Sequence, residues 1–309
     1  MTGVPPKKSW RDVDGILLLD KPQGLSSNQA LQKVRHLFEA KKAGHTGSLD
    51  PLATGLLPIC FGEATKIAGY LLGSRKAYAA QCRLGVTTTT DDAEGETLST
   101  RAVPTLSDAD IDAALAALRG RIVQTPPVYS AIKQGGVALY KRARRGEDVQ
   151  VPSREVEVAR LDLMGRDRDT LHLHVECGSG TYVRSLARDL GERLGCGAHL
   201  TALRRVWVEP FTSPQMHTLE NLERIKAEGG LGALDRLLLP LETGLAGMPA
   251  LTVSTEQAVL LKQGKRLTQM ALLDQSLCRA LDSDGRLVAL VEIDAYGEVR
   301  VRRGFNAAV

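Results

Sequence analysis

The sequence has few aromatic side chains: its 309 residues include four Phe, two Trp and six Tyr. Aromatic rings are the bulkiest side chains that can fill a core, so the interior must consist mainly of Leu, Val, Ile and Ala. No apolar run approaches the ~18 residues that a membrane-spanning helix needs. The polar residues 1–14 also lack the apolar segment of a secretory signal peptide. These absences predict a cytoplasmic protein without membrane contact.

The cysteines are also few and widely separated, at positions 60, 82, 177, 196 and 278, and no Cys-x-x-Cys pair occurs. This spacing indicates neither a disulfide framework nor a zinc site, and it predicts isolated thiols in the core. The pair His172 and His174 could ligate a metal, but its alternation with Leu171 and Leu173 is typical of one face of a strand. We therefore expect no metal site.

Hydrophobic periodicity predicts strands and helices that are interspersed without regular β-α-β alternation. Ser26 or Ser27 and Ser107 are predicted N-caps of two helices, and the glycine- and proline-rich residues 44–62 are predicted to form a loop. Further helices are predicted over residues 64–72 and 181–194, and strands over residues 15–20, 77–84, 155–163, 170–177 and 202–208. This pattern favours an α+β fold with a mixed, largely antiparallel sheet flanked by helices.

Glycine and proline gather near residues 239–250, which predicts a boundary between two domains. We expect a flexible segment, a main domain and a second domain over residues 1–14, 15–245 and 250–309. In the second domain, Ser-Thr-Glu-Gln at residues 254–257 has the form of a capping box, and Asp284-Gly285 indicates a hairpin turn. Short strands are predicted over residues 277–281, 287–293 and 298–303, so a small β-barrel is expected here.

The net charge of +4 says little about partners by itself, but basic residues are unevenly distributed. Residues 133–146 carry five basic residues and no acid: Lys133, Lys141, Arg142, Arg144 and Arg145. Such a segment suits contacts with nucleic-acid phosphates, whose strength falls steeply with salt. A solvated surface is the alternative interpretation.

Asp50 is the only acid between Glu39 and Glu63, and it lies within the glycine-rich residues 44–62. A site of two neighbouring carboxylates, as in glycosidases, is therefore not expected in this segment. The Gly-Lys-Ser/Thr of a phosphate-binding P-loop is also missing. An Asp before a proline such as Pro51 commonly forms a turn, so composition alone leaves the role of Asp50 open.

Residues 44–55, Gly-His-Thr-Gly-Ser-Leu-Asp-Pro-Leu-Ala-Thr-Gly, resemble the catalytic motif of the TruB-type tRNA pseudouridine synthases, with Asp50 at the position of the catalytic aspartate. Further blocks agree with this family in the same order, at residues 20–24, 76–78 with 84–85, 125–133, 180–186 and 199–205. Together the blocks cover residues 15–210. The position and strand pattern of the tail resemble a PUA RNA-binding domain.

The resemblance implies an isomerase that converts uridine 55 in the T-loop of tRNA to pseudouridine. In this reaction the glycosidic carbon–nitrogen bond breaks, the base turns, and a carbon–carbon bond forms, without any cofactor. The resemblance further implies that tRNA is the partner, that no other protein is obligatory, and that the chain is a monomer. An accompanying tRNA-folding activity is a further hypothesis, because a clamp that unfolds the tRNA elbow could also help it to refold.

The resemblance assigns four residues to catalysis: Asp50, Tyr78, Tyr182 and Arg184. Asp50 must be ionised to act either as nucleophile or as base on the sugar, and the sequence leaves that choice open. Arg184 matches an arginine that pairs with this carboxylate and favours its ionised form. Tyr78 matches the tyrosine that stacks on the flipped-out base, and it is a candidate for assisting loss of the proton from carbon 5. Tyr182 matches a second tyrosine near the aspartate.

The resemblance also places residues around the RNA. Leu203 matches an apolar floor beneath the base, and His45 matches a residue that enters the stack vacated in the T-loop. Lys21 and Pro22 match the first motif, and we expect them to support the catalytic loop. Residues 125–150 match a mobile insertion that clamps RNA, and the five basic residues named above lie within it.

One position departs from the family pattern, because Thr89 stands where the family usually has an acid. Asp92 keeps the second acid of that motif, and Asp91 is a candidate substitute for the first. Two other functions stay open: a non-catalytic RNA-binding or RNA-folding protein of the same fold, and a guide-RNA-dependent synthase that needs partner proteins. Retention of the four catalytic residues favours the enzyme.

Overall fold

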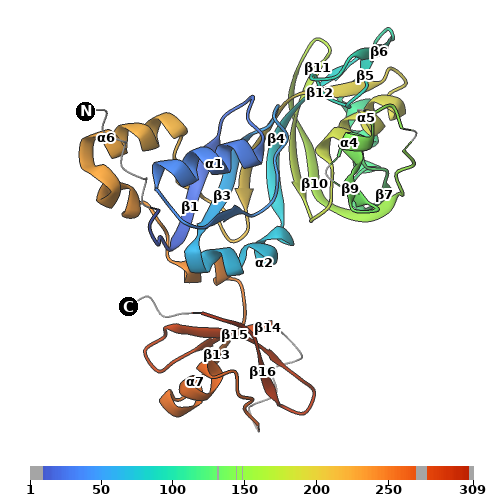
Figure 1. The fold of residues 1–309 in the computed structure, drawn as a ribbon. Helices are drawn as coiled ribbons and strands as arrows, with labels where there is room; N and C mark the ends of the chain where they lie inside the picture. Colours follow the sequence, from blue (N-terminus) through green and yellow to red (C-terminus); the bar gives the residue numbers. More distant parts are fainter. Residues whose placement is uncertain (1–9, 131, 144, 148, 269–276, 306–309) are drawn as a thin grey trace, which may run out of the picture.

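The computed structural model describes residues 10–305 except positions 131, 144, 148 and 269–276. Figure 1 shows a large body built around one long, curved sheet, with a smaller sheet domain attached to it near the end of the chain. The large sheet has eight strands. In spatial order these are β1 (Gly15–Lys21), β3 (Thr54–Phe61), β12 (Ala198–Val208), β4 (Lys76–Leu84), β11 (Thr170–Cys177), β10 (Arg154–Asp167) and β7 (Gly120–Gln124), with β2 (Ala43–His45) paired to β3.

The strand directions confirm the predicted α+β fold with a mixed, largely antiparallel sheet. β12 runs parallel to β3, whereas the other neighbouring strands in this order are antiparallel. Two short strand pairs lie outside the large sheet: β5 (Val86–Thr88) with β6 (Thr97–Thr100), and β8 (Lys133–Gln134) with β9 (Val137–Ala138). The contact of β3 with β12 brings the segment that precedes β3 next to β4 and β12.

The prediction of a loop over residues 44–62 is wrong, because β2 and β3 occupy most of this segment. β3 lies between β1 on one side and β2 and β12 on the other, and all of its residues after Thr54 are buried. A strand that is buried on both faces is a continuous apolar run without alternation, so the glycine and proline content of the segment suggested a loop instead. The loop itself is limited to residues 46–53.

Polar caps begin several helices, as the sequence predicts. Ser26 and Ser107 cap the first and third helices, each in a capping box. Residues 64–72 do not form one helix but a 3-10 turn, η1 (Gly62–Lys66), followed by a short helix. The helix over residues 219–235 was not predicted, although Thr218 is a good N-cap. The helices of the large body are α1 (Ser27–Leu37), α2 (Ala68–Leu72), α3 (Asp108–Ala116), α4 (Leu139–Ala143), α5 (Val183–Arg193) and α6 (Leu219–Asp235).

The main core lies between the sheet and helices α1, α3, α5 and α6, and it is largely aliphatic, as the composition predicts. Its buried aromatic members are Phe38, Phe61 and Tyr78. The largest fully buried side chains, however, are two basic ones, Arg205 and Lys21. Because a buried charge is costly unless it has a partner, these two residues mark the part of the sheet that carries the candidate site.

In its described residues, the smaller domain is a four-stranded sheet with one helix, α7 (Thr255–Lys262). The three predicted strands are confirmed, whereas the first strand, which pairs in parallel with the second, was not predicted. Leu290 of this domain is fully buried in one cluster with Ile16 and Ile67 of the large body, so the two parts share a core. The strands are β13 (Ala250–Thr252), β14 (Leu277–Leu281), β15 (Leu287–Ile293) and β16 (Val299–Gly304), after a 3-10 turn η2 (Leu241–Leu245).

All five cysteine side chains are buried, as the sequence predicts. Among the described residues, no group of three or more His, Cys, Asp and Glu side chains could hold a metal ion. None of the described helices combines the length and the apolar character needed to cross a bilayer.

Candidate active site

The loop between β2 and β3 presents Asp50, and neighbouring elements hold it in place. Ser27 of α1 accepts the Leu49 N–H at 2.7 Å and donates to the Leu49 carbonyl at 3.1 Å. Arg205 of β12 donates to the Gly47 carbonyl at 3.2 Å. Gly47 has a φ of 103°, a conformation that favours glycine. These contacts fix the path of the loop and therefore the position of the Asp50 carboxylate.

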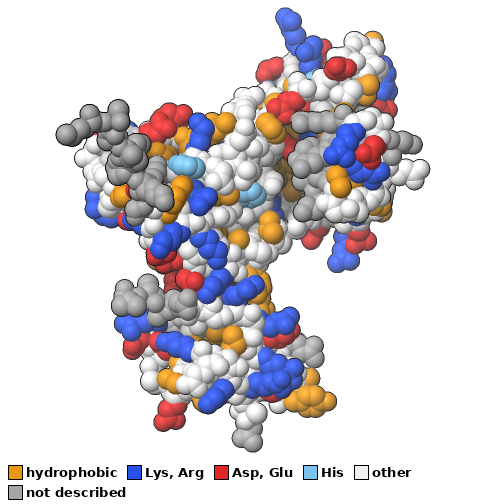
Figure 2. Space-filling model, viewed as in Figure 1, with side chains coloured by type: hydrophobic (Ala, Val, Ile, Leu, Met, Phe, Trp, Pro, Cys, Tyr) orange, Lys and Arg blue, Asp and Glu red, His pale blue; other side chains and the backbone are white. Residues whose placement is uncertain are grey.

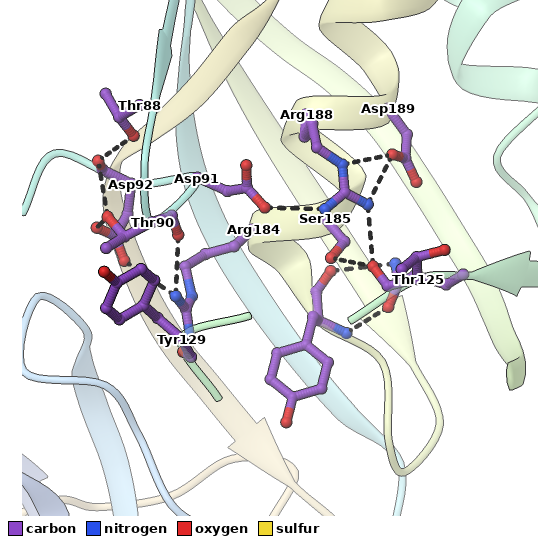
Figure 3. A network of polar contacts seen from close by, with 12 residues as sticks. Thr88, Thr90, Asp91, Asp92, Thr125, Tyr129, Arg184, Ser185, Arg188 and Asp189 are labelled. Atoms are coloured by element: carbon purple, nitrogen blue, oxygen red, sulfur yellow. Dashed lines mark hydrogen bonds and ion pairs between the residues drawn. The ribbon is translucent and has the colours of Figure 1, made fainter. Parts of the chain in front are cut away.

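Arg184, in the first turn of α5, is 5% exposed, and its Nη2 atom lies 2.9 Å from the Asp50 carboxylate. The same Nη2 donates to the Tyr129 carbonyl at 3.0 Å, and Nη1 donates to the Thr90 carbonyl at 2.9 Å. Nη1 also lies 3.5 Å from the buried carboxylate of Asp92. Figure 3 shows the carbonyls of Thr90 and Tyr129 converging on Arg184 from two segments. An arginine held in this way directs the carboxylate that it pairs with.

Opposing effects act on the pKa of Asp50. Burial raises this pKa above its ordinary value, and the charge of Asp92 adds to the rise, whereas Arg184 and Lys21 lower it. The net result is a raised pKa. The Asp50 side chain keeps 43% of its surface exposed. The site therefore contains an accessible carboxylate with a raised pKa that is paired with one arginine, a combination that is common at catalytic sites.

Asp50 and Arg184 lie in the wall of a pocket with a volume of about 250 Å³. Its lining comes from the Asp50 loop, the start of β4, the start of α5 with the turn before it, and β12. The pocket brings together residues that are far apart in the sequence. Five of the predicted site residues line it: Asp50, Tyr78, Tyr182, Arg184 and Leu203.

The two tyrosines and Leu203 give the pocket apolar surfaces near Asp50. Tyr78 of β4 is 8% exposed, and burial raises the pKa of its phenol, an effect that Arg205 opposes. Tyr182 is the N-cap of α5, and the Arg154 guanidinium lies 5.1 Å from the centre of its ring. Leu203 of β12 is also 8% exposed. Two aromatic rings and one aliphatic side chain therefore face the same space.

Lys21, Pro22 and His45 lie outside the residues that line this pocket. Lys21 is fully buried at the end of β1, and its ammonium donates to two backbone carbonyls at 2.9 and 2.6 Å. Burial lowers the pKa of Lys21 to about 8, and the negative charge of Asp50 opposes this effect. The turn after Pro22 contacts the loop, because the Gly24 N–H donates to the Pro51 carbonyl at 2.8 Å. His45 ends β2, and burial lowers its pKa.

Of the five basic residues predicted to contact RNA, Arg142 and Arg145 are described with their side chains, and neither lines this pocket. Figure 2 shows basic side chains beside an acidic one over α4. Arg142 donates to Glu147 at 2.6 Å, and Arg145 lies 3.9 Å from Glu147. Glu147, which follows the basic segment, therefore neutralises part of its charge. Of the other three residues, Arg144 is outside the described residues, and β8 and α4 contain Lys133 and Lys141.

The segment that contains Thr89, where the sequence departs from the family pattern, packs against α5. Thr89 accepts the Glu96 N–H at 3.1 Å. Asp91 pairs with Arg188 at 2.9 Å, which Figure 3 also shows, and its side chain is 17% exposed. Asp92, beside Arg184, is still more buried. The ion pair with Arg188 therefore holds Asp91 against the protein.

Two protein-family models match the chain: TruB family pseudouridylate synthase (N terminal domain) over residues 35–183, and tRNA pseudouridylate synthase B C-terminal domain over residues 184–246. The tRNA pseudouridine synthase B of Xanthomonas axonopodis pv. citri (strain 306) is 56% identical over 303 residues, which cover 98% of this chain and 97% of that relative. The chain belongs to the TruB family of pseudouridine synthases. The predicted resemblance is therefore confirmed, and the protein is an isomerase.

Further TruB-family relatives cover the chain to a similar extent. The tRNA pseudouridine synthase B of Xylella fastidiosa is 56% identical, over 96% of this chain and 98% of the relative. A solved Cbf5-Nop10-Gar1 complex has a similar fold, with a TM-score of 0.75 and 23% identity over 94% of this chain and 85% of that chain. At this identity the likeness to the solved structure concerns the fold alone, and it agrees with the sheet described above.

The pocket of this TruB-family protein also contains three basic residues that the sequence did not single out: Lys76, Arg154 and Arg205. Lys76 lies two positions before Tyr78 on β4, and residues two apart share one face of a strand. That alternation could have placed Lys76 beside Tyr78. Arg205 lies within the matched block at residues 199–205, although no role was assigned to it there. No comparable signal marks Arg154, which begins β10 just after the predicted clamp.

Proposed function

We propose that this protein converts uridine 55 in the T-loop of tRNA to pseudouridine. The family membership supports pseudouridine formation, and the relatives named tRNA pseudouridine synthase B support tRNA as the substrate. The choice of uridine 55 rests on the match of residues 44–55 and the other motif blocks to the TruB type. The observation that carries the proposal is the ion pair of Asp50 with Arg184 inside a pocket lined by Tyr78, Tyr182 and Leu203.

The proposed reaction is an internal rearrangement of one nucleotide. The bond between carbon 1′ of the ribose and nitrogen 1 of uracil breaks, and a bond between carbon 1′ and carbon 5 forms. Carbon 5 loses its proton, and nitrogen 1 gains one. Atoms and electrons balance without an oxidant, a reductant or a cofactor.

Asp50 would act on the ribose in its ionised form, either as the nucleophile at carbon 1′ or as the base. Arg184 favours this form through its charge and fixes the direction of the carboxylate. Since burial raises the pKa of Asp50, the arginine offsets part of the cost of keeping the carboxylate charged in the pocket.

The uridine must leave the stack of the T-loop to reach this pocket, at a cost of roughly a few kcal/mol. Tyr78 is well placed to stack on the extruded base, and Leu203 to support it. Burial raises the pKa of the Tyr78 phenol, so the phenol is protonated at neutral pH. In the proposal, His45 enters the space that the base leaves in the T-loop.

The remaining parts of the chain would hold the RNA. We assign catalysis to residues 15–245, an RNA clamp to residues 125–150, and a PUA-like RNA-binding role to residues 250–309. The clamp is supported by its basic segment and by the Tyr129 carbonyl, which contacts Arg184. The strands of the small sheet domain and its position in the chain support the PUA-like role of residues 250–309.

The test compares Asp50→Asn with the wild-type protein on a T-arm RNA, with pseudouridine located by mass-resolved mapping. We expect the variant to form pseudouridine at least ~10³-fold more slowly, as is usual when a residue acts directly on the substrate. Asp12→Asn is the matched control, because the Asp12 side chain is 81% exposed and does not line the pocket. Wild-type rates in the Asp50→Asn protein would show that the assignment of Asp50 is wrong, and product at another uridine would contradict the choice of uridine 55.

The same samples separate the other functions. A guide-RNA-dependent synthase would need partner proteins, so activity of the purified single chain on bare RNA excludes it. A non-catalytic RNA-folding protein would form no pseudouridine with any variant. If the protein also folds tRNA, the Asp50→Asn protein rescues misfolded tRNA without modifying it.

A further inference from the structure

Lys76 and Arg205 line the pocket but take no part in the chemistry proposed above. Lys76 begins β4 and is 8% exposed. Its Nζ atom donates to the Leu72 and Ser74 carbonyls at 3.1 and 2.6 Å, and both of these acceptors are neutral. Within the described part of the chain, no carboxylate oxygen lies within 4.0 Å of this nitrogen. The ammonium of Lys76 is therefore buried without an ion pair, and the more distant Glu209 carboxylate raises its pKa by less than burial lowers it.

Arg205, on the neighbouring strand β12, is in the same situation. It is 1% exposed, and it donates to the Leu56 and Gly47 carbonyls at 2.7 and 3.2 Å. A Cβ placed on Gly47 would lie 3.7 Å from Nη1 of Arg205 and 3.9 Å from Cε of Lys76, so both side chains approach the same point of the loop. Burial, together with the charge of Arg205, lowers the pKa of Lys76 to about 8.

The other charges of the pocket do not balance these two. Asp50 pairs with Arg184, and Arg154 lies against the ring of Tyr182 without an ion pair among the described residues. The lining thus has one carboxylate and four basic side chains: Lys76, Arg154, Arg184 and Arg205. Burial of an unpaired charge is unfavourable even after the protein relaxes around it. An anionic group that enters the pocket would offset that cost.

We propose that Lys76 and Arg205 form a binding site for a backbone phosphate of the nucleotide that is flipped into the pocket. The inference rests on the proposed function, which brings one nucleotide of an RNA chain next to Asp50. The base and the ribose of that nucleotide are neutral, so its phosphates are the only anionic groups available. A lysine has three N–H donors and an arginine has five, and the carbonyl contacts above leave donors on both side chains for phosphate oxygens.

The test pairs Lys76→Met with T-arm RNAs in which a single phosphate, on the 5′ or the 3′ side of the target uridine, is replaced by a neutral methylphosphonate. Binding is measured in the Asp50→Asn background, so that no substrate is consumed. Loss of one hydrogen-bonded charge contact weakens binding by about 10- to 100-fold. We expect Lys76→Met to lose this much affinity for unmodified RNA. For the RNA in which the contacted phosphate is neutral, the Lys76→Met protein and the protein that keeps Lys76 should bind equally, because the contact is already lost. If Lys76→Met weakens binding by the same factor whichever of the two phosphates is neutral, the proposal is overturned.

The salt dependence of binding gives a second measurement that packing alone would not change. A lost contact with a single-stranded phosphate lowers the slope of log K against log salt by about 0.7. Lys76→Arg should keep the slope, and Lys33→Met, at an exposed position of α1 outside the pocket lining, should keep both slope and affinity. An unchanged slope in Lys76→Met would count against the phosphate contact even if the affinity falls. Thermal unfolding of each variant shows whether it is folded.

Two further arms separate the alternatives. Inorganic phosphate, tested at constant ionic strength, should compete poorly with RNA; tight competition that disappears in Lys76→Met would assign the site to a free anion and overturn the backbone assignment. Pseudouridine formation by the wild-type protein on the unmodified RNA is recorded in the same series. If no pseudouridine forms, the proposed function is refuted. If pseudouridine forms, but Lys76→Met weakens binding by the same factor whichever phosphate is neutral, only the phosphate site is refuted.

Discussion

Arg184 connects Asp50 to the rest of the site. Its terminal nitrogens contact the carboxylates of Asp50 and Asp92 and the carbonyls of Thr90 and Tyr129. Tyr129 belongs to the proposed RNA clamp, so the position of the Asp50 carboxylate depends on a segment that would contact RNA. Because two carboxylates share one arginine, each is neutralised less completely than it would be in a simple pair.

The pH dependence of the reaction should report this sharing. Burial raises the pKa of Asp50, and the negative charge of Asp92 raises it further. The acid limb of kcat/KM should therefore lie above the ordinary value for an aspartate, ~3.9. In Asp92→Asn the second negative charge is gone, so the pKa of Asp50 falls and the acid limb moves to lower pH. The measurement is the pH profile of pseudouridine formation on a T-arm RNA.

Asp12→Asn removes one negative charge from an exposed position and serves as the control for that profile. Its acid limb should coincide with that of the wild-type protein. An acid limb that stays in place or moves upward in Asp92→Asn would contradict the electrostatic coupling of the two carboxylates.

Two elements set the geometry of the site. α5 holds the segments on either side of it, because Ser185 donates to the Thr125 carbonyl at 2.9 Å and Arg188 binds both Asp91 and the same carbonyl, as Figure 3 shows. β3 brings the Asp50 loop against β12 through a close backbone approach at Gly55. One helix and one strand contact therefore position residues that are more than a hundred positions apart.

Gly55→Ala tests the strand contact. Gly55 has a φ of 95°, and a Cβ at this position would lie 2.2 Å from the Arg205 carbonyl oxygen. The methyl group must displace β3 from β12, so the variant should lose at least about 2 kcal/mol of unfolding free energy and should lower the rate of pseudouridine formation. Thermal and denaturant unfolding measure the first effect.

Gly69→Ala is the matched control, since an added Cβ at Gly69 in α2 meets no atom within 4 Å. Alanine there should stabilise the protein by about 0.4–1 kcal/mol. Equal stabilities for the two variants would show that the close approach of β3 to β12 is not rigid.

At the scale of the whole molecule, the small sheet domain is joined to the large body by a shared apolar core. Leu290 of β15 is fully buried together with Ile16 of β1, Ile67 and Leu245. The Lys66 ammonium also donates to the Gly304 carbonyl at 3.0 Å across the same junction. Under the proposed function, this attachment would hold the surface of residues 250–309 against the large body while both parts bind one folded RNA.

Leu290→Ala should weaken this junction. Truncation of a buried leucine costs about 2–5 kcal/mol, because it removes apolar contacts and leaves a cavity. We expect a lower melting temperature for the whole chain in thermal unfolding. Tyr296→Ala, at a side chain that is 92% exposed, should leave the melting temperature unchanged. A melting temperature equal to that of the wild type in Leu290→Ala would mean that the two parts unfold independently of this contact.

The sequence by itself determined the fold class, the family and the motif that contains Asp50. Motif residues and cap residues act on their neighbours in the sequence. The helix caps Ser26 and Ser107 and the motif at residues 44–55 could therefore be predicted from the local sequence. Periodicity also located the strands that have one exposed face, such as β4 and β11. It could not locate β3, because a strand buried on both faces shows no alternation.

Beyond the Asp50–Arg184 pair that the resemblance implied, only the tertiary structure decided which charges meet. Arg184 reaches Asp50 because α5 and the β2–β3 loop meet at one pocket, and the burial that raises the pKa of Asp50 comes from all of the surrounding segments. Lys76 and Arg205 have no ion pair among the described residues for the same reason, because strand pairing, not distance along the sequence, sets their neighbours. Electrostatic energies depend on distance and hydration in three dimensions, and neither quantity is written in the order of the residues.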